Sequence, residues 1–275
     1  MRRRLGTLAL YGPLTVLAAI FLVPFYLIVR TAVMTIPQST SLTWQWFPTS
    51  VTLGNFATLF SDPSAPMASG LVNSALISTF TLVFSILFSS MAGYALARIP
   101  VRGRNLVLYA VIVTLMIPGA VTFVPTYIVV GSLGGVNTLW GIIVPGLFNA
   151  FSTFLFRQFY LRFPVEIEEA GKIDGLGYFR VYWHLLLPNS KGIMVALGLL
   201  AFMESWNSFL WPLVIGQNPS DYTVQLVIST FLTEQGINLP ELFAGACIAV
   251  LPVVVVFLIM QRYIVQGVTM TGIRG

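Results

Sequence analysis

Six long apolar runs, separated by short polar segments, dominate this chain of 275 residues. Each run approaches or exceeds the roughly 20 apolar residues that a helix needs to cross the hydrocarbon core of a bilayer. The runs cover approximately residues 8–33, 69–97, 106–130, 139–156, 192–216 and 242–265. They do not alternate apolar with polar residues as the strands of a membrane barrel do. Because only helices and closed barrels can span lipid, we predict an all-α polytopic membrane protein with six transmembrane helices.

The composition supports a membrane protein and restricts its chemistry. Charged residues make up 8 % of the chain and hydrophobic residues 57 %, whereas charged residues make up about 25 % of a soluble domain. His184 and Cys247 are the only histidine and the only cysteine, which excludes an intrachain disulfide, a histidine dyad and a cysteine or histidine metal cluster. We therefore expect one transmembrane domain over residues 1–275, with no metal site and no catalytic residues.

The basic residues predict the orientation of the chain, because lysine and arginine accumulate on the cytoplasmic side of a membrane. With a cytoplasmic N-terminus, thirteen of the fourteen basic residues lie in or beside the segments 1–7, 98–105, 157–191 and 266–275. Only Arg30 falls near the outer end of the first run, and the outer loops carry acidic but no basic residues. We predict that both termini are cytoplasmic. The net charge of +5 then reflects membrane insertion and contact with anionic lipid, not nucleic acid binding.

A charged loop at about residues 157–191 joins the fourth run to the fifth. Pro164 suits the first turn of a helix, and acidic residues follow it, where the helix dipole favours them. Gly175 permits a sharp turn without a steric penalty, and an aromatic segment at 178–187 follows. We predict that the charged loop is a helix, a glycine turn and a second helix.

The first helix of the charged loop has two different faces. Phe163, Ile167, Ala170 and Ile173 recur at helical spacing and form an apolar face. Glu168 stands four residues before Lys172, where the two side chains can form an ion pair. An amphipathic helix that rests on lipid carries basic residues on its polar face, whereas this polar face is largely acidic. Docking of a protein partner is therefore the favoured interpretation.

The charged loop resembles the EAA loop of permease subunits in binding-protein-dependent ABC importers. The pattern of that loop is E-A-A, three residues, G, nine residues and I-x-L-P. Its positions are occupied here, at the same spacing, by Glu169, Ala170, Gly171, Gly175, Leu185, Leu187 and Pro188. The departures are small: Gly171 replaces the second alanine and Leu185 replaces isoleucine.

Other segments resemble the carbohydrate branch of that family. They are A-G-Y-A-L-A-R at 92–98, M-I-P at 116–118, W-N-S-F-L-W-P-L at 206–213 and the tail G-V-T-M-T-G-I-R-G at 267–275. The tail resembles the ending of the smaller permease subunit of the maltose transporter and its relatives. The resemblance thus implies half of the translocation pathway for a sugar or sugar derivative. It names no cargo, and a permease for a polyamine, phosphate or glycerol phosphate stays an alternative.

The resemblance also implies partners. The first helix of the charged loop would dock on a cytoplasmic ATPase subunit, present in two copies. A second permease subunit and an extracytoplasmic solute-binding protein would complete the assembly in the cytoplasmic (inner) membrane of a bacterium or archaeon. The coupling residues carried over are Glu169, Ala170, Gly171, Asp174, Gly175, Pro188 and, in the tail, Arg274. The chain has no G-x-x-x-x-G-K-[ST] phosphate loop, so ATP and magnesium would bind to the ATPase, and this chain would bind no cofactor and catalyse no reaction.

Candidates for the substrate pathway lie in the second and fifth runs. An ionisable side chain within a span is a functional candidate by default, which singles out Glu204, although an interhelical hydrogen bond or protonation of the side chain explains it equally well. The other candidates are Trp206, Asn207, Trp211 and Asn73. Pro118, Pro125 and Pro212 can kink their helices and expose carbonyl groups to a cavity.

Two other classes of protein are less favoured. A secondary transporter working alone is expected to show an inverted repeat or a set of intramembrane acids for ion coupling, and the sequence shows neither. An intramembrane enzyme is a more distant alternative, because one histidine and one cysteine do not supply a convincing catalytic set.

Overall fold

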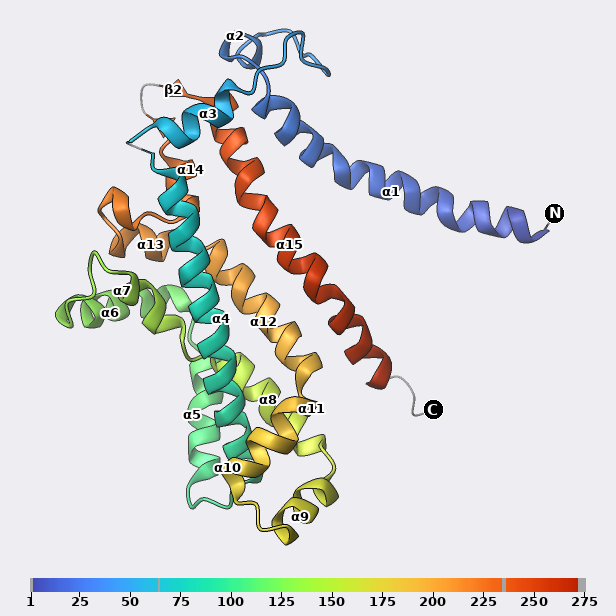
Figure 1. The fold of residues 1–275 in the computed structure, drawn as a ribbon, viewed down its shortest axis with the longest axis vertical. Helices are drawn as coiled ribbons and strands as arrows, with labels where there is room; N and C mark the ends of the chain where they lie inside the picture. Colours follow the sequence, from blue (N-terminus) through green and yellow to red (C-terminus); the bar gives the residue numbers. More distant parts are fainter. Residues whose placement is uncertain (1, 64, 234–235, 272–275) are drawn as a thin grey trace. The chain divides into compact units, whose positions relative to one another are not determined.

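The computed structural model describes residues 2–63, 65–233 and 236–271, with side chains described over 11–63, 65–232 and 238–262. Within these ranges the chain is predominantly helical (Figure 1). The extended structure described is one antiparallel pair of two-residue strands, β1 (Leu232–Thr233) and β2 (Gly236–Ile237). The predicted helical class is confirmed.

The helices follow one another in chain order. The first four are α1 (Arg2–Ala32), α2 (Ile36–Ser39), α3 (Gly54–Ser61) and α4 (Met67–Arg98). The next group comprises α5 (Arg104–Met116), α6 (Gly119–Ser132), α7 (Leu139–Ile143), the 3-10 turn η1 (Val144–Gly146) and α8 (Ala150–Arg162). The charged loop holds α9 (Val165–Ile173), α10 (Tyr178–Val181), the π-helical segment η2 (Tyr182–Leu186) and α11 (Leu187–Asn189). The last elements are α12 (Lys191–Trp206), α13 (Leu210–Ile215), η3 (Pro219–Asp221), α14 (Val224–Ser229) and α15 (Leu239–Thr271).

The chain forms two compact units. Unit 1 comprises Met1–Ala68 with Leu226–Leu251, and unit 2 comprises Ser69–Gln225 with Pro252–Gly275. The expectation of one transmembrane domain over residues 1–275 stays a prediction.

Four helical segments of the described chain are long and apolar enough to span a membrane. The number rises to six if each of two bent pairs of helices is counted as one span. The four are Tyr11–Ala32, Met67–Arg98, Leu139–Arg162 and Leu239–Arg262. The bent pairs are Arg104–Met116 with Gly119–Ser132, at 106°, and Tyr178–Asn189 with Lys191–Trp206, at 80°. The described chain therefore has four to six candidate spans, at positions close to the predicted runs, and the count of six and the side of each terminus stay predictions.

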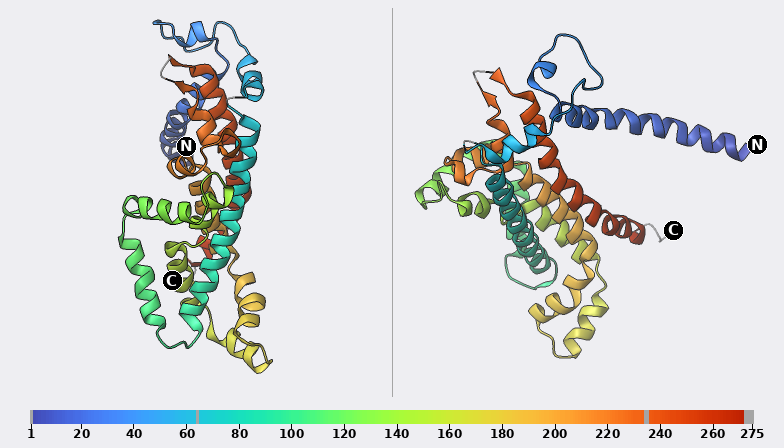
Figure 2. Two further views of the ribbon diagram at one scale, coloured as in Figure 1. Left: turned by 90° about the vertical axis from the view of Figure 1, so that its left-hand side faces the viewer. Right: turned by 45° about the horizontal axis from the view of Figure 1, so that its top comes forward.

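The third run does not form one continuous helix, because Pro118 breaks it. A proline disfavours the helical conformation of the residue before it, and Ile117 is accordingly extended, with φ −87° and ψ 118°. Pro118 caps α6, which leaves at a sharp angle to α5 (Figure 2). Pro125, by contrast, lies inside α6. The proline thus breaks the run where only a kink was expected.

The fourth and fifth runs are also interrupted. Residues 147–149 separate η1 from α8, where the Asn149 side chain accepts a hydrogen bond from the Ser152 amide at 2.8 Å and caps the new helix. Residues 207–209 separate α12 from α13. Pro212 lies in the first turn of α13, where its missing N–H group costs no hydrogen bond. Unit 2 therefore contains three breaks within apolar runs.

The core of unit 2 joins α4 and α8 to the second helical segment of the charged loop. Gly93 of α4 lies so close to α8 that an added Cβ atom would stand 2.6 Å from Phe156 Cβ and 2.9 Å from the Arg157 amide. Small residues permit this approach between membrane helices. Tyr182 of η2 forms a buried hydrogen bond of 2.7 Å with Ser90 of α4. The loop is thus attached to two spans through a packed aromatic core that includes Tyr94 and Tyr160.

The structure of unit 1 explains the position of Arg30, the one basic residue that departs from the predicted charge distribution. The side chain of Arg30 is only 8 % exposed, and its Cζ lies 4.6 Å from the centre of the Trp44 ring. Next to it, the Asn55 side-chain amide donates to the carbonyls of Ala32 (2.7 Å) and Met34 (2.9 Å). Arg30 is thus a buried residue in the last turn of α1, and a cation–π contact stabilises its charge.

Candidate functional site

Local chemistry explains the two ends of α9 in the charged loop. The helix begins directly after Pro164, with Glu166 and Glu168 in its first turn. It ends in a left-handed Gly175, with φ +82°. The Gly175 amide donates to the Lys172 carbonyl at 3.0 Å, and the Leu176 amide donates to the Gly171 carbonyl at 2.9 Å. These two bonds form a Schellman motif, so the predicted helix and glycine turn are present in the structure.

The inner face of α9 is made of Glu168 and Gly171, both buried. At Gly171 an added Cβ would lie 2.7 Å from Leu185 Cδ1 and 3.5 Å from Val181 Cγ2. The departure from the E-A-A pattern therefore has a packing reason, since the missing methyl group lets α9 lie close to the second helical segment. Gly171 is a packing residue of the loop.

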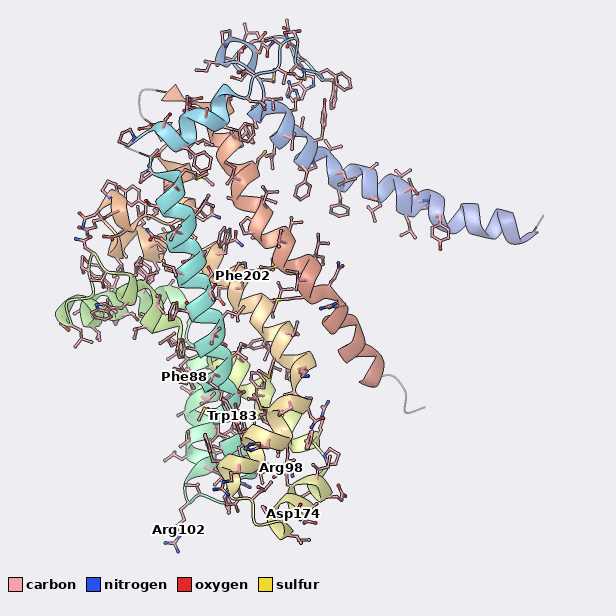
Figure 3. All side chains as sticks on the ribbon, in the orientation of Figure 1. Phe88, Arg98, Arg102, Asp174, Trp183 and Phe202 are labelled. Atoms are coloured by element: carbon pink, nitrogen blue, oxygen red, sulfur yellow. The ribbon has the colours of Figure 1, made fainter. Side chains whose placement is uncertain are left out.

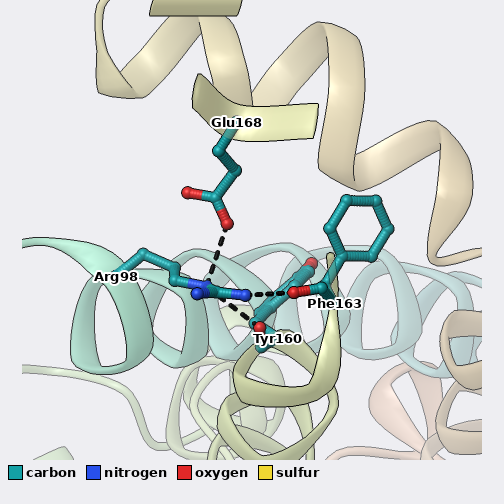
Figure 4. Close-up of polar contacts among 4 residues, drawn as sticks. All are labelled: Arg98, Tyr160, Phe163 and Glu168. Carbon is teal, nitrogen blue, oxygen red and sulfur yellow. Dashed lines mark hydrogen bonds and ion pairs between the residues drawn. The ribbon is translucent and has the colours of Figure 1, made fainter. Parts of the chain in front are cut away.

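Glu168 is held by Arg98, the last residue of α4 (Figure 4). Arg98 Nε lies 2.9 Å from Glu168 Oε1, and the two side chains are 16 % and 2 % exposed. The arginine also donates to the Tyr160 carbonyl at 3.1 Å and, through Nη2, to the Phe163 carbonyl. Oε1 has no hydrogen-bond donor among the described residues, so the interaction with Arg98 is one of charge without an aligned hydrogen bond.

Burial decides the protonation behaviour of this carboxyl group. Desolvation raises the pKa of Glu168, and the charges of Arg98 and, to a smaller extent, Lys172 act in the opposite direction. The expected pairing of Glu168 with Lys172 is therefore secondary. The ammonium group of Lys172 lies 5.0 Å from the centre of the Tyr178 ring. We did not predict from the sequence that Arg98 contacts the charged loop, because no local pattern connects positions 98 and 168.

The outer face of α9 carries both acidic and apolar side chains. Glu169, Ala170 and Asp174 are exposed, and so are Ile167 and Ile173, the latter at 85 %. The predicted apolar face therefore points away from the chain from Ile167 to Ile173, whereas Phe163 is half-buried against the core of unit 2. Beside it, Phe179 and Trp183 are both exposed and stack with ring centres 6.2 Å apart. Asp174 and Trp183 lie at the same end of unit 2 as Arg98 and Arg102 (Figure 3).

Two predicted coupling residues remain, Pro188 of the charged loop and Arg274 of the tail. Pro188 is exposed and lies in α11, between the π-helical segment and the 80° bend. Because a proline cannot donate to the carbonyl four residues earlier, the hydrogen-bond pattern of a regular α-helix cannot continue through η2 and α11. Arg274 lies outside the described residues.

A second candidate site is a cavity of about 350 Å³ in unit 2. It adjoins the breaks in the three apolar runs. Residues of α4, α6, α7, η1, α12, α13 and the connecting segments line it: Ile77, Thr81, Ser85, Gly119, Thr122, Phe123, Thr126, Ile142, Pro145, Gly146, Phe148, Asn149, Ala201, Glu204, Ser205, Ser208 and Trp211. Discontinuous helices form substrate sites in many transporters, and here they bring six hydroxyl side chains and one carboxyl group together.

Two of the five predicted pathway residues line this cavity, Glu204 and Trp211. The Trp211 indole donates to the Gly141 carbonyl at 3.2 Å and packs edge-on against Phe123. Both interactions hold the ring in one orientation at the cavity wall.

The other three predicted pathway residues are not among those that line the cavity. Trp206 is 2 % exposed and stacks on Phe202. Asn207 donates to the Met203 carbonyl at 2.8 Å and accepts from Gln225 at 3.4 Å. Asn73 is buried and donates to the carbonyls of Ser220 and Tyr222. We did not identify the serine and threonine residues of the cavity from the sequence, although pairs such as Thr81 and Ser85 stand at helical spacing within an apolar run.

The matches to known proteins agree with one another, because each is a component of a transport system. Residues 85–270 match the model of the family described as "Binding-protein-dependent transport system inner membrane component". The chain is 35 % identical over 228 residues to the arabinooligosaccharides transport system permease protein AraQ of Halalkalibacterium halodurans, covering 83 % of this chain and 81 % of the relative. It is 31 % identical to the lactose transport system permease protein LacG of Rhizobium radiobacter, covering 97 % and 96 %. It is 34 % identical to the sn-glycerol-3-phosphate transport system permease protein UgpE of Yersinia enterocolitica, covering 74 % and 73 %.

The fold is shared with a solved transporter. A chain in the crystal structure of a bacterial ABC transporter involved in the import of the acidic polysaccharide alginate superimposes with a TM-score of 0.83 and 19 % sequence identity, covering 94 % of this chain and 96 % of that one. Since the family match covers more than half of the residues, including the charged loop and most of the lining of the cavity, the chain belongs to the family of binding-protein-dependent transport system inner membrane components.

Proposed function

We propose that this chain is one of the two permease subunits of an ATP-driven ABC importer and forms half of the translocation pathway for a sugar or sugar derivative. The observation that carries the proposal is the outward face of α9, which is held to α4 by the buried Arg98–Glu168 pair and lies within the matched family region. The family and the relatives that transport arabinooligosaccharides and lactose support a sugar. The relative that transports glycerol 3-phosphate supports a non-sugar solute as the second candidate.

In this proposal, α9 docks on one of two cytoplasmic ATPase subunits. Glu169 meets a basic residue of the ATPase, while the exposed Ile173 supplies apolar contact area beside it. Because α9 is fixed to α4 and η2, closure of the ATPase dimer would move the spans as rigid bodies, which is how transporters alternate access. ATP and magnesium bind to the ATPase, and the tail near Arg274 contributes a further contact.

The proposed orientation places the charged loop in the cytoplasm of a bacterium or archaeon. Arg98 and Arg102 lie at the same end of unit 2 as the loop (Figure 3), and basic residues favour the cytoplasmic side. The opposite side would receive an extracytoplasmic solute-binding protein, and membrane lipid and a second permease subunit would surround the spans.

Copurification tests this proposal. The tagged chain, expressed with the neighbouring reading frames, is expected to retain an ATPase subunit through membrane solubilisation. Glu169→Lys should abolish both retention and uptake, because it places like charges at the interface. Arg102→Glu is the matched control, since it also reverses a charge at this end of unit 2 but outside the charged loop. Retention of the ATPase with normal uptake in Glu169→Lys, at equal protein levels in the membrane, would refute the docking role.

A further inference from the structure

We infer that the cavity of unit 2 selects solutes by charge: it accepts uncharged saccharides and disfavours anionic ones. Glu204 is the residue that determines this selectivity. This inference rests on the proposed function as a permease and adds a substrate class to it. It separates two kinds of solute that the relatives transport, neutral oligosaccharides and a phosphate ester.

The lining of the cavity supplies the first argument. Among the described residues that line it, Glu204 is the only one with a charged side chain. The remaining polar side chains are hydroxyls, such as Thr81, Thr122 and Ser208, and the Asn149 amide. Guanidinium and ammonium groups, which proteins use to bind phosphate and carboxylate, do not occur among these residues. An anionic solute would therefore meet a carboxylate without a compensating cation.

Helix ends near the cavity do not reverse this balance. Gly119, the first residue of α6, lines the cavity, and a helix N-terminus is equivalent to about half a positive elementary charge. The full negative elementary charge of a carboxylate is larger than this half charge. The N-terminus of α8 is nearby as well, but the Asn149 side chain already accepts a hydrogen bond from its Ser152 amide. The net electrostatic effect of the lining is therefore negative.

The same lining suits an uncharged saccharide. Sugar hydroxyls both donate and accept hydrogen bonds, and they find an acceptor in the Glu204 carboxylate and mixed partners in the threonine and serine hydroxyls. The Trp211 ring, which its bond to the Gly141 carbonyl holds in place, offers an apolar wall to the C–H groups of a sugar ring. The cavity volume of about 350 Å³ falls within the range of about 300–1,000 Å³ that is usual for small-molecule sites.

Charged thiol reagents test the electrostatics in the assembled importer. In a Cys247→Ser background, Ser208→Cys places a single thiol at the cavity, and Thr122→Cys provides a second position if the first variant fails to assemble. Cationic and anionic methanethiosulfonates are compared, and the ratio of their rates is divided by the ratio at Thr40→Cys, an exposed position outside the cavity. We expect the corrected ratio to favour the cationic reagent by at least about tenfold and to fall to near one in Glu204→Gln. A ratio that Glu204→Gln leaves unchanged overturns the inference.

Protection by solutes tests the substrate class. Excess lactose should slow modification of the cavity thiol, whereas glycerol 3-phosphate should not, unless Glu204→Gln is also present. Protection by glycerol 3-phosphate and not by lactose in the protein with Glu204 intact, or protection by neither, overturns the inference. These outcomes leave the permease function standing if the chain still retains its ATPase and supports uptake. Loss of ATPase retention in the unmodified protein would instead refute the proposed function.

Discussion

At the scale of single residues, the pair of Arg98 and Glu168 connects a span to the loop that carries α9. Both side chains are largely removed from water, and the arginine also binds the carbonyls of Tyr160 and Phe163 at the end of α8. One guanidinium group therefore joins the C-terminal end of α4, the end of α8 and the inner face of α9. Removing either charge leaves the other buried, which costs more than the intact pair gains.

Arg98→Ala is expected to destabilise unit 2 by about 3–5 kcal/mol, because it leaves the Glu168 carboxylate buried without a partner. Arg98→Ala combined with Glu168→Gln should recover part of this loss, since the neutral amide is cheaper to bury. Thermal unfolding of the solubilised protein measures both effects. Arg102→Ala, at an exposed position in the turn after α4, should leave the midpoint unchanged. Equal midpoints for the single and the double variant would contradict the role of the pair.

The raised pKa of Glu168 predicts a pH dependence of stability. A carboxyl group with a higher pKa in the folded than in the unfolded protein binds more protons when folded, so its contribution to stability decreases as the pH rises. The decrease begins near the ordinary value of 4.5 and is complete above the raised pKa. Glu168→Gln should remove this component, so the difference in midpoint between wild type and variant should change across that window. A constant difference from pH 4 to pH 8 would show that the carboxyl group does not titrate differently on folding.

At the scale of elements, the end and the packing of α9 depend on the glycine turn that follows the helix as well as on the residues of the helix itself. The Schellman motif needs a left-handed residue at position 175, and the close packing on the second helical segment needs glycine at position 171. Gly177, two residues on, has an ordinary φ of −74° and no atom within 4 Å of an added Cβ. The three glycines of this loop therefore differ in how much they tolerate a side chain.

Gly175→Ala should destabilise the loop by about 1–2 kcal/mol, the cost of a Cβ atom in the left-handed conformation. Gly175→Asn should cost less, because asparagine adopts this conformation more readily. Gly177→Ala is the control and should be nearly neutral. Hydrogen exchange over residues 165–176 measures the effect locally, and ATPase retention measures its consequence for docking. Equal protection in Gly175→Ala and Gly177→Ala would argue against the motif.

At the scale of the whole molecule, the chain combines long helices with apolar runs that break. The breaks at residues 117–118, 147–149 and 207–209 adjoin a single cavity in unit 2. Interrupted helices are tolerated at membrane depth where they are enclosed by protein or line a cavity. The dense contact between α4 and α8 at Gly93 lies in the same unit as this open region, so unit 2 pairs a tightly packed core with a polar cavity.

Gly93→Ala should destabilise unit 2 by about 1–3 kcal/mol, the usual cost of overpacking. The added methyl group would meet the backbone of α8 as well as Phe156, and backbone cannot rotate away as a side chain can. Gly12→Ala in α1 has nothing within 4 Å and should be neutral or slightly stabilising. The thermal midpoints of the two variants, measured on the intact assembly, check this prediction. A Gly93→Ala midpoint no lower than that of Gly12→Ala would contradict it.

The sequence by itself determined the helical membrane class, the approximate positions of the apolar runs and the helix–turn–helix of the charged loop. These features depend on hydropathy, proline and glycine, which act within a few residues. Only the tertiary structure decided which face of α9 is buried, because Glu168 is neutralised by a partner 70 residues earlier in the chain. It also decided that Glu204 and Trp211 share a cavity while Trp206, Asn207 and Asn73 do not line it, because that cavity is built from four segments that only folding brings together.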